Sequence, residues 1–487
     1  MEREFDENFQ NPSSEFRGAP FWAWNCKLDQ KQLLEQIDYF KEMGMGGFHM
    51  HCRIGLDTPY MGDEFLAIVK ACVEKAKNNG MLAWLYDEDR WPSGFGGGLV
   101  TKEEKYRSRV IVFSPVNKDA ADGFDSKMSS SRKLLARYEV TLKDGLLVHY
   151  HRLKEGEDGD NIWYAYLEVA QSDPWYNDQT YVDTLNPEAI KRFIETTHEK
   201  YAEAVGEYFG TTIPAIFTDE PQFTRRNTLG YADEKKDIIL PYTDDFNESY
   251  CKQYGEDFFD TLPELIWELP DNKVSASRYH YHDHVAERFA SAFADTLGNW
   301  CKQHNIMLTG HMMEEPTLHS QTCAIGEAMR SYRSFEQPGI DMLCDWREYT
   351  TAKQAQSAAH QFGCKGITSE LYGVTNWDFD FRGHKLQGDW QAALGVVTRV
   401  HHLAWVSMEG EAKRDYPASI FYQSPWYKEY ALIENHFARV NLAMTEGKPC
   451  VKVGVIHPIE SYWLAFGPEE QTSSTRKHLE QNFDSIV

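Results

Sequence analysis

The sequence predicts an α/β fold, a (β/α)8 TIM barrel with an inserted antiparallel β subdomain and a short C-terminal α/β extension. Three observations favour this fold. Short apolar runs alternate with helical patterns, which is typical of a parallel sheet. Eight such strand–helix units can be counted, the number that closes a barrel. Most of the apolar runs end in polar or acidic residues, and a barrel gathers such strand ends at one mouth.

The alternation begins with helices expected over residues 30–43 and 63–77, each leading into a strand, at 45–51 and 81–86. The six later strands are expected at 181–185, 214–218, 306–313, 339–344, 366–369 and 402–408. The later helices are expected at 187–208, 283–304, 351–362 and 389–400. Asn186 followed by Pro187 is a typical helix start, since Asn caps the first turn and Pro fits within it.

Two segments interrupt this alternation. Between residues 106 and 171 short alternating strands, at 109–113, 135–141, 146–150 and 161–170, predict the inserted antiparallel subdomain. The aromatic and acidic segment 225–281 is expected to be a largely helical excursion after the fourth strand that helps to wall the site.

These patterns divide the chain into four expected parts. We expect an N-terminal tail over 1–17, a catalytic barrel over 18–450 and, within it, the inserted subdomain over 106–171. Residues 451–457 look like the first strand of a second α/β domain, but only about 30 residues follow, too few to complete one. Residues 451–487 are therefore expected to be the start of a truncated second domain or a docked tail.

A doubly wound open sheet is the rival architecture. It would bind a ligand at a topological switch point, commonly through a glycine-rich phosphate loop. Neither GxGxxG nor GxxxxGK[ST] follows any of the expected strands, so the barrel is favoured.

The composition excludes several classes of function. The 487 residues include 50 Lys and Arg against 75 Asp and Glu, a net charge of −25, which argues against nucleic acid or an anionic membrane as partner. No run of 18 apolar residues and no signal-peptide pattern is present, so no membrane span is expected. The nine cysteines are scattered without a CxxC pair, which favours a reduced, cytoplasmic protein. The oligomeric state is not indicated.

Acidic residues follow several of the apolar runs. They are Asp87, Glu88, Asp89, Asp219, Glu220, Glu314, Glu315, Asp341, Glu370 and Glu409. Crowding of carboxyl groups raises some of their pKa values, which supplies a protonated acid beside an ionised base. Hydrolysis of a glycosidic bond needs such a pair.

Glu220 and Glu370 are the strongest candidates for that pair. Glu220 follows the fourth expected strand and precedes Pro221, while Glu370 ends the seventh. Acids at these two positions are the arrangement of a large clan of barrel glycosidases. Some of the other acids could instead cap helices or pair with Arg53, Arg90, Lys413 and Arg414.

Aromatic residues also gather near the expected strand ends, among them Trp24, Trp91 and Tyr372. Sugars present flat C–H faces that pack on aromatic rings, so these residues could contact a carbohydrate. They could equally fill the core.

Two histidines support a competing hypothesis. His49 and His51 lie two residues apart on one strand, so they project to the same side, and His311 could add a third ligand. A metal-dependent amide or ester hydrolase could use them. However, we find no Lys at the end of strand four and no His at the end of strand six, and strand eight closes with Glu409 rather than Asp.

Three motifs carry a family resemblance. The stretches FWAWN (21–25), GGFHMHCRIGL (46–56) and WLYDEDRWPSG (84–94) resemble the α-L-rhamnosidases of glycoside hydrolase family 106. The later stretches FTDEP (217–221), GHMMEE (310–315), PGID (338–341) and TSE (368–370) continue the match, which runs from about residue 18 to residue 460.

The resemblance implies inverting hydrolysis of α-L-rhamnosides by a (β/α)8 catalytic domain, and it allows for a dependence on calcium (Ca2+). By position it makes Glu220 the general acid and Glu370 the general base, or the reverse, with Glu314 or Glu315 as a third acid. In an inverting site the two carboxyl groups lie about 6.5–9.5 Å apart, against about 5–5.5 Å in a retaining one. We expect substrate contacts from Trp24, His49, His51, Arg53, Asp87, Glu88, Trp91, Asp219, His311, Tyr372 and Glu409.

Family members are usually longer than this chain and usually exported, so a related glycoside is an alternative substrate. A non-catalytic carbohydrate-binding barrel is the remaining hypothesis. The sequence requires no cofactor and places no metal ligands.

Overall fold

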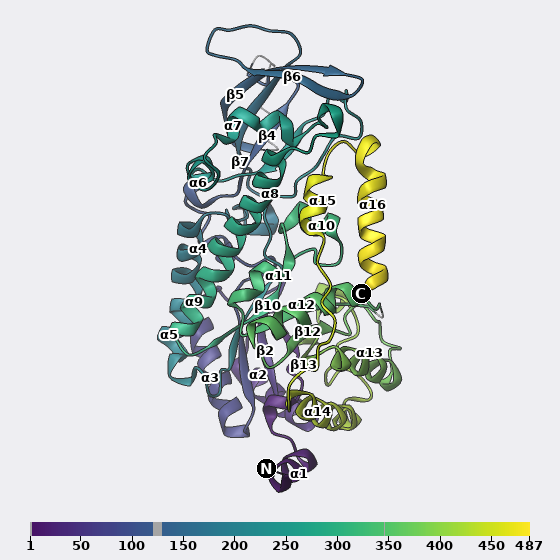
Figure 1. The fold of residues 1–487 in the computed structure, drawn as a ribbon. Coiled ribbons are helices and arrows are strands. Elements are labelled where there is room, and N and C mark those ends of the chain that lie inside the picture. Colours follow the sequence, from purple (N-terminus) through teal and green to yellow (C-terminus); the bar gives the residue numbers. More distant parts are fainter. Residues whose placement is uncertain (1, 120–128, 345) are drawn as a thin grey trace.

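The computed structural model describes residues 2–119, 129–344 and 346–487 (Figure 1). Its larger sheet is parallel, and its strands follow one another around a barrel. They are β1 (Phe21–Trp24), β2 (Gly47–Cys52), β3 (Leu82–Tyr86), β8 (Ala215–Asp219), β10 (Met307–His311), β11 (Gln337–Met342), β12 (Ile367–Leu371), β13 (Val396–His401) and β14 (Ala404–Trp405). β14 follows β13 almost directly and pairs in parallel with β1, which brings the barrel close to closure. The predicted TIM barrel is confirmed.

Two errors in the predicted strand count cancel. The first strand is β1, which the sequence analysis did not assign as a strand. Residues 181–185 form no strand, and Val182 makes only an isolated bridge to Arg107. β8 and β12 therefore remain the fourth and seventh strands. All four residues of β1 are buried, so it lacks the polar alternation that marks a half-exposed strand.

The eighth strand also lies earlier than predicted. β13 covers Val396–His401, where the end of a helix was expected, and only the short β14 falls within 402–408. The preceding helix, α13, covers Phe381–Ala393. A buried strand that follows a helix after two residues gives an unbroken apolar pattern, so periodicity alone does not mark the boundary.

Helices pack on the strands from outside. α2 (Gln30–Glu42), α3 (Asp63–Asn79), α12 (Tyr349–Phe362) and α14 (Ala431–Thr445) show the arrangement. α3 buries six residues at helical spacing, from Phe65 to Ala76, and ends where Gly80 adopts a left-handed backbone with φ +69°. The remaining helices of the barrel and its loops are α4 (Pro187–Phe193), α5 (Glu199–Val205), α8 (Ala276–Phe289), α9 (Thr296–Gln303), α10 (Leu318–Ala324) and α11 (Ala328–Ser331). α1 (Glu2–Gln10) precedes them all.

The inserted antiparallel sheet is also confirmed. It holds β4 (Arg109–Ser114), β5 (Ser129–Lys143), β6 (Leu146–Arg152), β7 (Ile162–Ala170) and β9 (Ile238–Pro241), in the order β6-β5-β7-β4-β9. β9 comes from the excursion 225–281, which otherwise carries α6 (Phe246–Tyr254), α7 (Phe258–Thr261) and the start of α8. This segment packs on the sheet, because the rings of Trp163 and Trp267 lie 5.0 Å apart.

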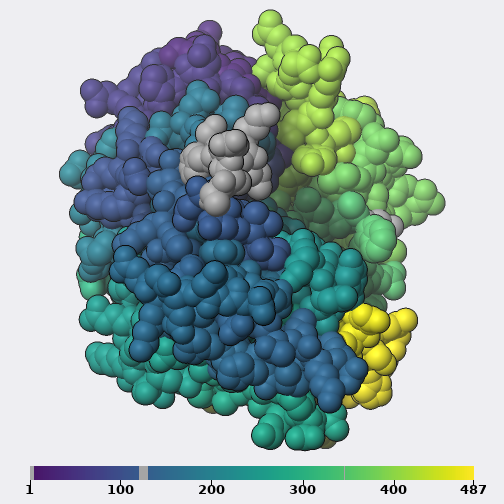
Figure 2. Space-filling view, turned by 90° about the horizontal axis from the view of Figure 1, so that it is seen from above, coloured from purple at the N-terminus to yellow at the C-terminus, as the bar shows by residue number. Residues whose placement is uncertain are grey.

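The strand expected at 451–457 does not form. Val453 and Ile456 are exposed, and no described residue pairs with this segment as a strand. Two helices follow, α15 (Ile459–Leu464) and α16 (Glu469–Ile486), and they dock through a buried cluster that includes Trp463 and Phe483. α16, yellow in Figure 2, reaches the blue antiparallel strands, where the Gln471 side chain donates a hydrogen bond to the carbonyl of Gly145.

Within the part of the chain that the structure describes, no helix is both long and apolar enough to cross a membrane.

Candidate active site

The strand register brings the acidic strand ends together. His311, the last residue of β10, lies beside Asp219, the last residue of β8. On the neighbouring strands, Asp341 of β11 lies beside Glu370 of β12. These four residues come from consecutive strands, so their side chains belong to one side of the barrel mouth.

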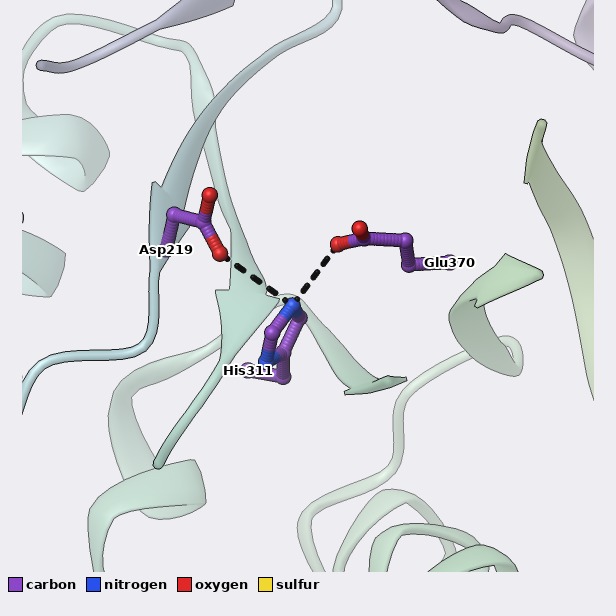
Figure 3. Close-up of side chains that lie close together, drawn as sticks. All are labelled: Asp219, His311 and Glu370. Atoms are coloured by element: carbon purple, nitrogen blue, oxygen red, sulfur yellow. Dashed lines mark hydrogen bonds and ion pairs between the residues drawn. The ribbon is translucent and has the colours of Figure 1, made fainter. Parts of the chain in front are cut away.

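His311 bridges two carboxylates at the centre of this group (Figure 3). Its Nε2 atom lies 3.0 Å from Glu370 Oε2 and 3.3 Å from Asp219 Oδ1. His311 is 1% exposed, and both carboxylate residues are 5% exposed. A single imidazole nitrogen therefore contacts two buried carboxylates.

This arrangement fixes opposite charges. Burial alone would lower the pKa of His311, but the hydrogen bond to Glu370 and the charge of Asp219 raise that pKa well above its usual value. Burial alone would raise the pKa of Glu370, but the hydrogen bond from His311 and the charge of His402 bring it below its usual value. At neutral pH we therefore expect an imidazolium beside an ionised Glu370.

Glu220 has the opposite protonation. Burial, and after it the charge of Asp219, raise the pKa of Glu220 to about 8. Its backbone is left-handed, with φ +51°, and its N–H donates to the carbonyl of His311 at 3.1 Å. The side chain is only partly buried. At neutral pH we therefore expect Glu220 to be mostly protonated, and its side chain keeps some access to the mouth.

Asp341 is a further neutral acid in this group. Burial, and then the charge of Glu370, raise its pKa well above the usual value. Its Oδ1 atom is buried without a hydrogen-bond partner among the described residues.

Glu315 and Glu314, the expected third acids, are differently placed. Glu315 is buried, accepts hydrogen bonds from the Tyr332 hydroxyl and the N–H of Met312, and has its pKa raised to about 7 by burial. Glu314 forms an ion pair with Arg225 at 2.5 Å. Among the described residues, no hydrogen bond joins either acid to Asp219, His311 or Glu370.

Asp87 and Glu88, which are expected to contact substrate, hold the loop that follows β3 in this structure. Both are fully buried. Glu88 accepts hydrogen bonds from four backbone N–H groups, those of Asp89, Gly94, Gly96 and Gly97, at 2.6–3.0 Å. Gly97 can present its N–H there because its φ is +61°.

That loop in turn holds Asp219. Ser93 donates from its hydroxyl to Asp87 at 2.6 Å, and the same hydroxyl accepts from the N–H of Asp219 at 2.8 Å. The Tyr86 hydroxyl donates to Asp219 Oδ2 at 2.6 Å. Sequence reasoning missed the supporting role of Ser93 and Tyr86, although both lie in the WLYDEDRWPSG stretch.

His49 and His51 lie on the second strand, not the first, and both are fully buried in the barrel. The Nδ1 atom of His49 lies 2.8 Å from the carbonyl oxygen of Ala19, and burial lowers the pKa of His49 to about 3. The ring of His51 packs on Tyr86 at 4.1 Å. They are neutral core residues in contact with aromatic rings, and nothing in the described residues favours a metal site at this pair.

The other expected contact residues are spread around the mouth and the core. Arg53 forms a bidentate pair with Asp415, at 2.7 and 2.9 Å, and its guanidinium lies 4.3 Å from the ring of Trp91. Trp24 and Tyr372 are fully buried, and Tyr372 donates to the carbonyl of His384. Glu409 is exposed.

His402 is a site residue that sequence reasoning missed. Its Nε2 lies 3.6 Å from Glu370 Oε1. The available signal was its position directly after a barrel strand, but the misplaced eighth strand concealed it.

The described residues contain one group that could hold a metal ion, Asp219, His311 and Glu370, with ligand atoms within 4.8 Å of one another. Ca2+ prefers oxygen ligands, and a protonated imidazole offers no lone pair. This donor set therefore does not fit the calcium ion that the resemblance allows for.

A hollow of about 820 Å3 lies at the opposite end of the barrel. It is lined by the beginnings of strands, including Leu82, Met307 and Gln337, and by none of the acids of the mouth. We assign it no part in the chemistry, because barrel active sites form at the carboxyl ends of the strands.

Solved structures show what the fold is similar to. A rhamnosidase from Novosphingobium sp. PP1Y is similar with a TM-score of 0.65 and 14% identity, over 91% of this chain and 61% of that one. The likeness shows a shared fold. This chain spans less than two thirds of the rhamnosidase's length. An endo-β-1,4-mannanase from Thermotoga petrophila has a TM-score of only 0.41 at 9% identity, over 88% of this chain and 78% of that one. A β-galactosidase from Marinomonas ef1 has a TM-score of only 0.42 at 9% identity, over 85% of this chain and 59% of that one.

No family model matches the chain. No curated protein matches its sequence.

Proposed function

We propose that this protein is a glycoside hydrolase that cleaves α-L-rhamnosides or closely related glycosides with inversion, with Glu220 as general acid and Glu370 as general base. The observation that carries the proposal is the placement of two carboxyl groups in one barrel mouth: Glu370 is hydrogen-bonded to the buried His311, and the charge of Glu370 contributes to the raised pKa of Glu220. The choice of rhamnosides rests on the motif resemblance and on the fold shared with the Novosphingobium rhamnosidase.

Glu220 is the acid because it holds a proton at neutral pH, its pKa being raised to about 8 by burial and by Asp219. It would give that proton to the glycosidic oxygen as the bond to the anomeric carbon breaks. The leaving group then departs as a neutral alcohol.

Glu370 is the base because His311 keeps it ionised. It would take a proton from a water molecule that attacks the anomeric carbon from the face opposite the leaving group. After one turnover Glu370 is protonated and Glu220 ionised, and proton exchange with solvent restores both.

Asp219 and His311 are positioning residues in this scheme. The imidazolium orients the Glu370 carboxylate through a 3.0 Å hydrogen bond, and Asp219, 3.3 Å from the same Nε2 atom, stabilises the imidazolium. The imidazolium repels the positive charge that develops on the sugar ring, so in this scheme His311 acts on Glu370 and not on the sugar.

The test uses two substrates that differ in leaving-group acidity, 2,4-dinitrophenyl and methyl α-L-rhamnoside. Glu220→Gln should retain much of the activity on the first and lose that on the second, because a good leaving group needs no proton. Glu370→Gln should lose both. Glu429→Gln, an exposed acid outside the expected site, is the matched control.

NMR of the first-formed sugar anomer reports the stereochemistry. The β-anomer supports inversion, and the α-anomer would make Glu370 a nucleophile. Sugar binding without hydrolysis of any aryl glycoside would instead favour the carbohydrate-binding barrel.

A further inference from the structure

One side of the mouth carries exposed apolar side chains. Trp377 and Val374 lie on the loop between β12 and α13, and Tyr416 and Met408 lie on the loop between β14 and α14. We call these four residues the apolar rim. Trp377 is 38% exposed and Tyr416 is 47% exposed, which are large exposed fractions for aromatic side chains.

The two loops are joined to each other and to the barrel. The N–H of Asn376 donates to the carbonyl of Pro417 at 2.8 Å, so the loop residues next to Trp377 and Tyr416 are bonded together. The ring of Trp377 also packs edge-on against the buried ring of Trp405 in β14, at 5.7 Å. In Figure 2 the lime-coloured part of the chain, which contains the second loop, borders a recessed area of the surface.

The apolar rim adjoins the proposed base. The ring of Tyr416 lies 6.0 Å from the ring of His402, and His402 lies 3.6 Å from Glu370. The rim loops follow β12 and β14, while Glu220 follows β8, three strands before β12 in the barrel order. The rim is therefore on the side of Glu370.

Three polar side chains of these loops are already engaged. Asp415 is paired with Arg53 through both carboxylate oxygens. Asn376 Oδ1 accepts from the N–H of Trp377, and the Thr375 hydroxyl donates to the carbonyl of Tyr372. Apart from the Tyr416 hydroxyl, the rim offers ring and aliphatic surface, and a sugar hydroxyl packed against that surface would lose its hydrogen bonds to water without gaining others.

We propose that Trp377 and Tyr416 determine specificity by receiving the methyl group of a 6-deoxy sugar in the glycone position. The inference rests on the proposed function, and it assigns a contact to two residues. In an inverting site the leaving group departs on the side opposite the base. A surface beside Glu370 therefore faces the sugar that is being transferred to water, and the part of a 6-deoxyhexose that suits an apolar surface is its C6 methyl group.

The test compares three 4-nitrophenyl glycosides that differ only at this position: the α-L-rhamnoside with a methyl group, the α-L-lyxoside with hydrogen, and the α-L-mannoside with a hydroxymethyl group. In the unmodified protein kcat/KM should favour the rhamnoside by about 10–200-fold, the range for one methyl group in an apolar site. Trp377→Ala and Tyr416→Ala should each reduce that preference by about tenfold or more, mainly through the rhamnoside.

Two variants control for indirect effects. Tyr416→Phe keeps the ring and should keep the preference. Phe362→Ala removes an exposed ring at the opposite end of the barrel and should leave all three rates unchanged. If Trp377→Ala fails to fold, Tyr416→Ala carries the test alone, since its ring is the more exposed of the two.

The outcomes separate this inference from the proposed function. Equal losses on all three glycosides, or an effect that follows a change of leaving group instead of the sugar, would overturn the inference and leave the glycosidase proposal intact. If no glycoside is hydrolysed, the proposed function fails; binding of free L-rhamnose and L-lyxose, followed by tryptophan fluorescence, then decides the inference. Tighter binding of rhamnose that Tyr416→Ala abolishes supports it, and equal binding overturns it.

Discussion

Glu370 accepts a hydrogen bond from the buried imidazole of His311 at 3.0 Å. The same imidazole nitrogen faces Asp219, so one positive charge lies between two carboxylates on β8 and β12. Because the three side chains are almost inaccessible to water, their charges interact more strongly than on the surface. The ionised state of Glu370 is therefore maintained by His311, which lies on β10, between the strands that carry Asp219 and Glu370.

Replacing His311 should move the acidic limb of the pH profile. In His311→Gln the imidazolium is lost, so the pKa of Glu370 should rise toward and above its usual value, because burial is then no longer opposed by that charge. Activity needs the ionised base, so the acidic limb of kcat/KM should shift to higher pH, with kcat lower by about 100-fold. His402→Gln, at 3.6 Å from Glu370, should shift the limb less. An acidic limb that stays in place would show that His311 does not control Glu370.

The basic limb should report Glu220. A general acid must be protonated, so activity should fall as pH rises through about 8, the pKa to which burial and the charge of Asp219 raise Glu220. Asp219→Asn removes that neighbouring charge, and the limb should then move to lower pH. The measurement is kcat/KM against pH on methyl α-L-rhamnoside. Thr224→Ala, a nearby substitution that alters no charge, is the control. A limb that moves upward would contradict the assignment of Glu220.

The sequence predicted the barrel because its signal is repeated: helices such as α3 and α12 were placed within two residues, and the apolar runs before Asp219 and Glu370 were correct. It did not predict β1, where four buried residues show no alternation, or the limits of β13, which only two residues separate from the end of α13. Both strands are buried on two faces. Their residues are apolar without alternation, so periodicity does not distinguish such a strand from a buried stretch of helix.

The site was predictable at the level of which strand ends carry acids, but not of how those acids are used. Glu88 and Glu370 each follow or end an apolar run, yet Glu88 binds four backbone N–H groups while Glu370 faces His311. The difference depends on the path of the loop after β3, and a sequence pattern holds no information on where such a loop folds back. His402, which lies 3.6 Å from Glu370, was missed for another reason, because the eighth strand was predicted too late in the chain.

The buried pair of Glu434 and Arg399 should be a main contributor to stability. Burial would raise the pKa of Glu434, but the charge of Arg399, together with His401, lowers it to about 2. Glu434 bonds Arg399 at 2.7 Å, His401 at 3.0 Å and the N–H of Gly18 at 2.9 Å. Glu434→Gln leaves the buried guanidinium without its counter-charge, which should lower the free energy of unfolding by about 3–5 kcal/mol at pH 7.

The sign of the pH dependence follows from the depressed pKa. The stabilisation by Glu434 should be complete above pH 4.5, the ordinary value for an unfolded Glu, and should be lost as pH falls from there toward about 2. Urea unfolding at several pH values measures it, with Glu429→Gln as an exposed control. If Glu434→Gln and the unmodified protein lose stability in parallel over this range, the ion pair does not carry the effect.

Glu88 should couple the stability of the loop after β3 to activity. In Glu88→Gln one carboxylate oxygen becomes an NH2 group, which faces two backbone N–H groups that it cannot accept from, so the free energy of unfolding should fall by about 3 kcal/mol. Ser93 lies on the same loop and accepts from the N–H of Asp219, so kcat should fall as well, with little change in KM. Urea unfolding and steady-state kinetics on the same samples measure both, and Glu103→Gln, an exposed acid, is the control. A loss of stability without a loss of kcat would mean that Asp219 keeps its position without this loop, because Tyr86 alone then suffices to hold it.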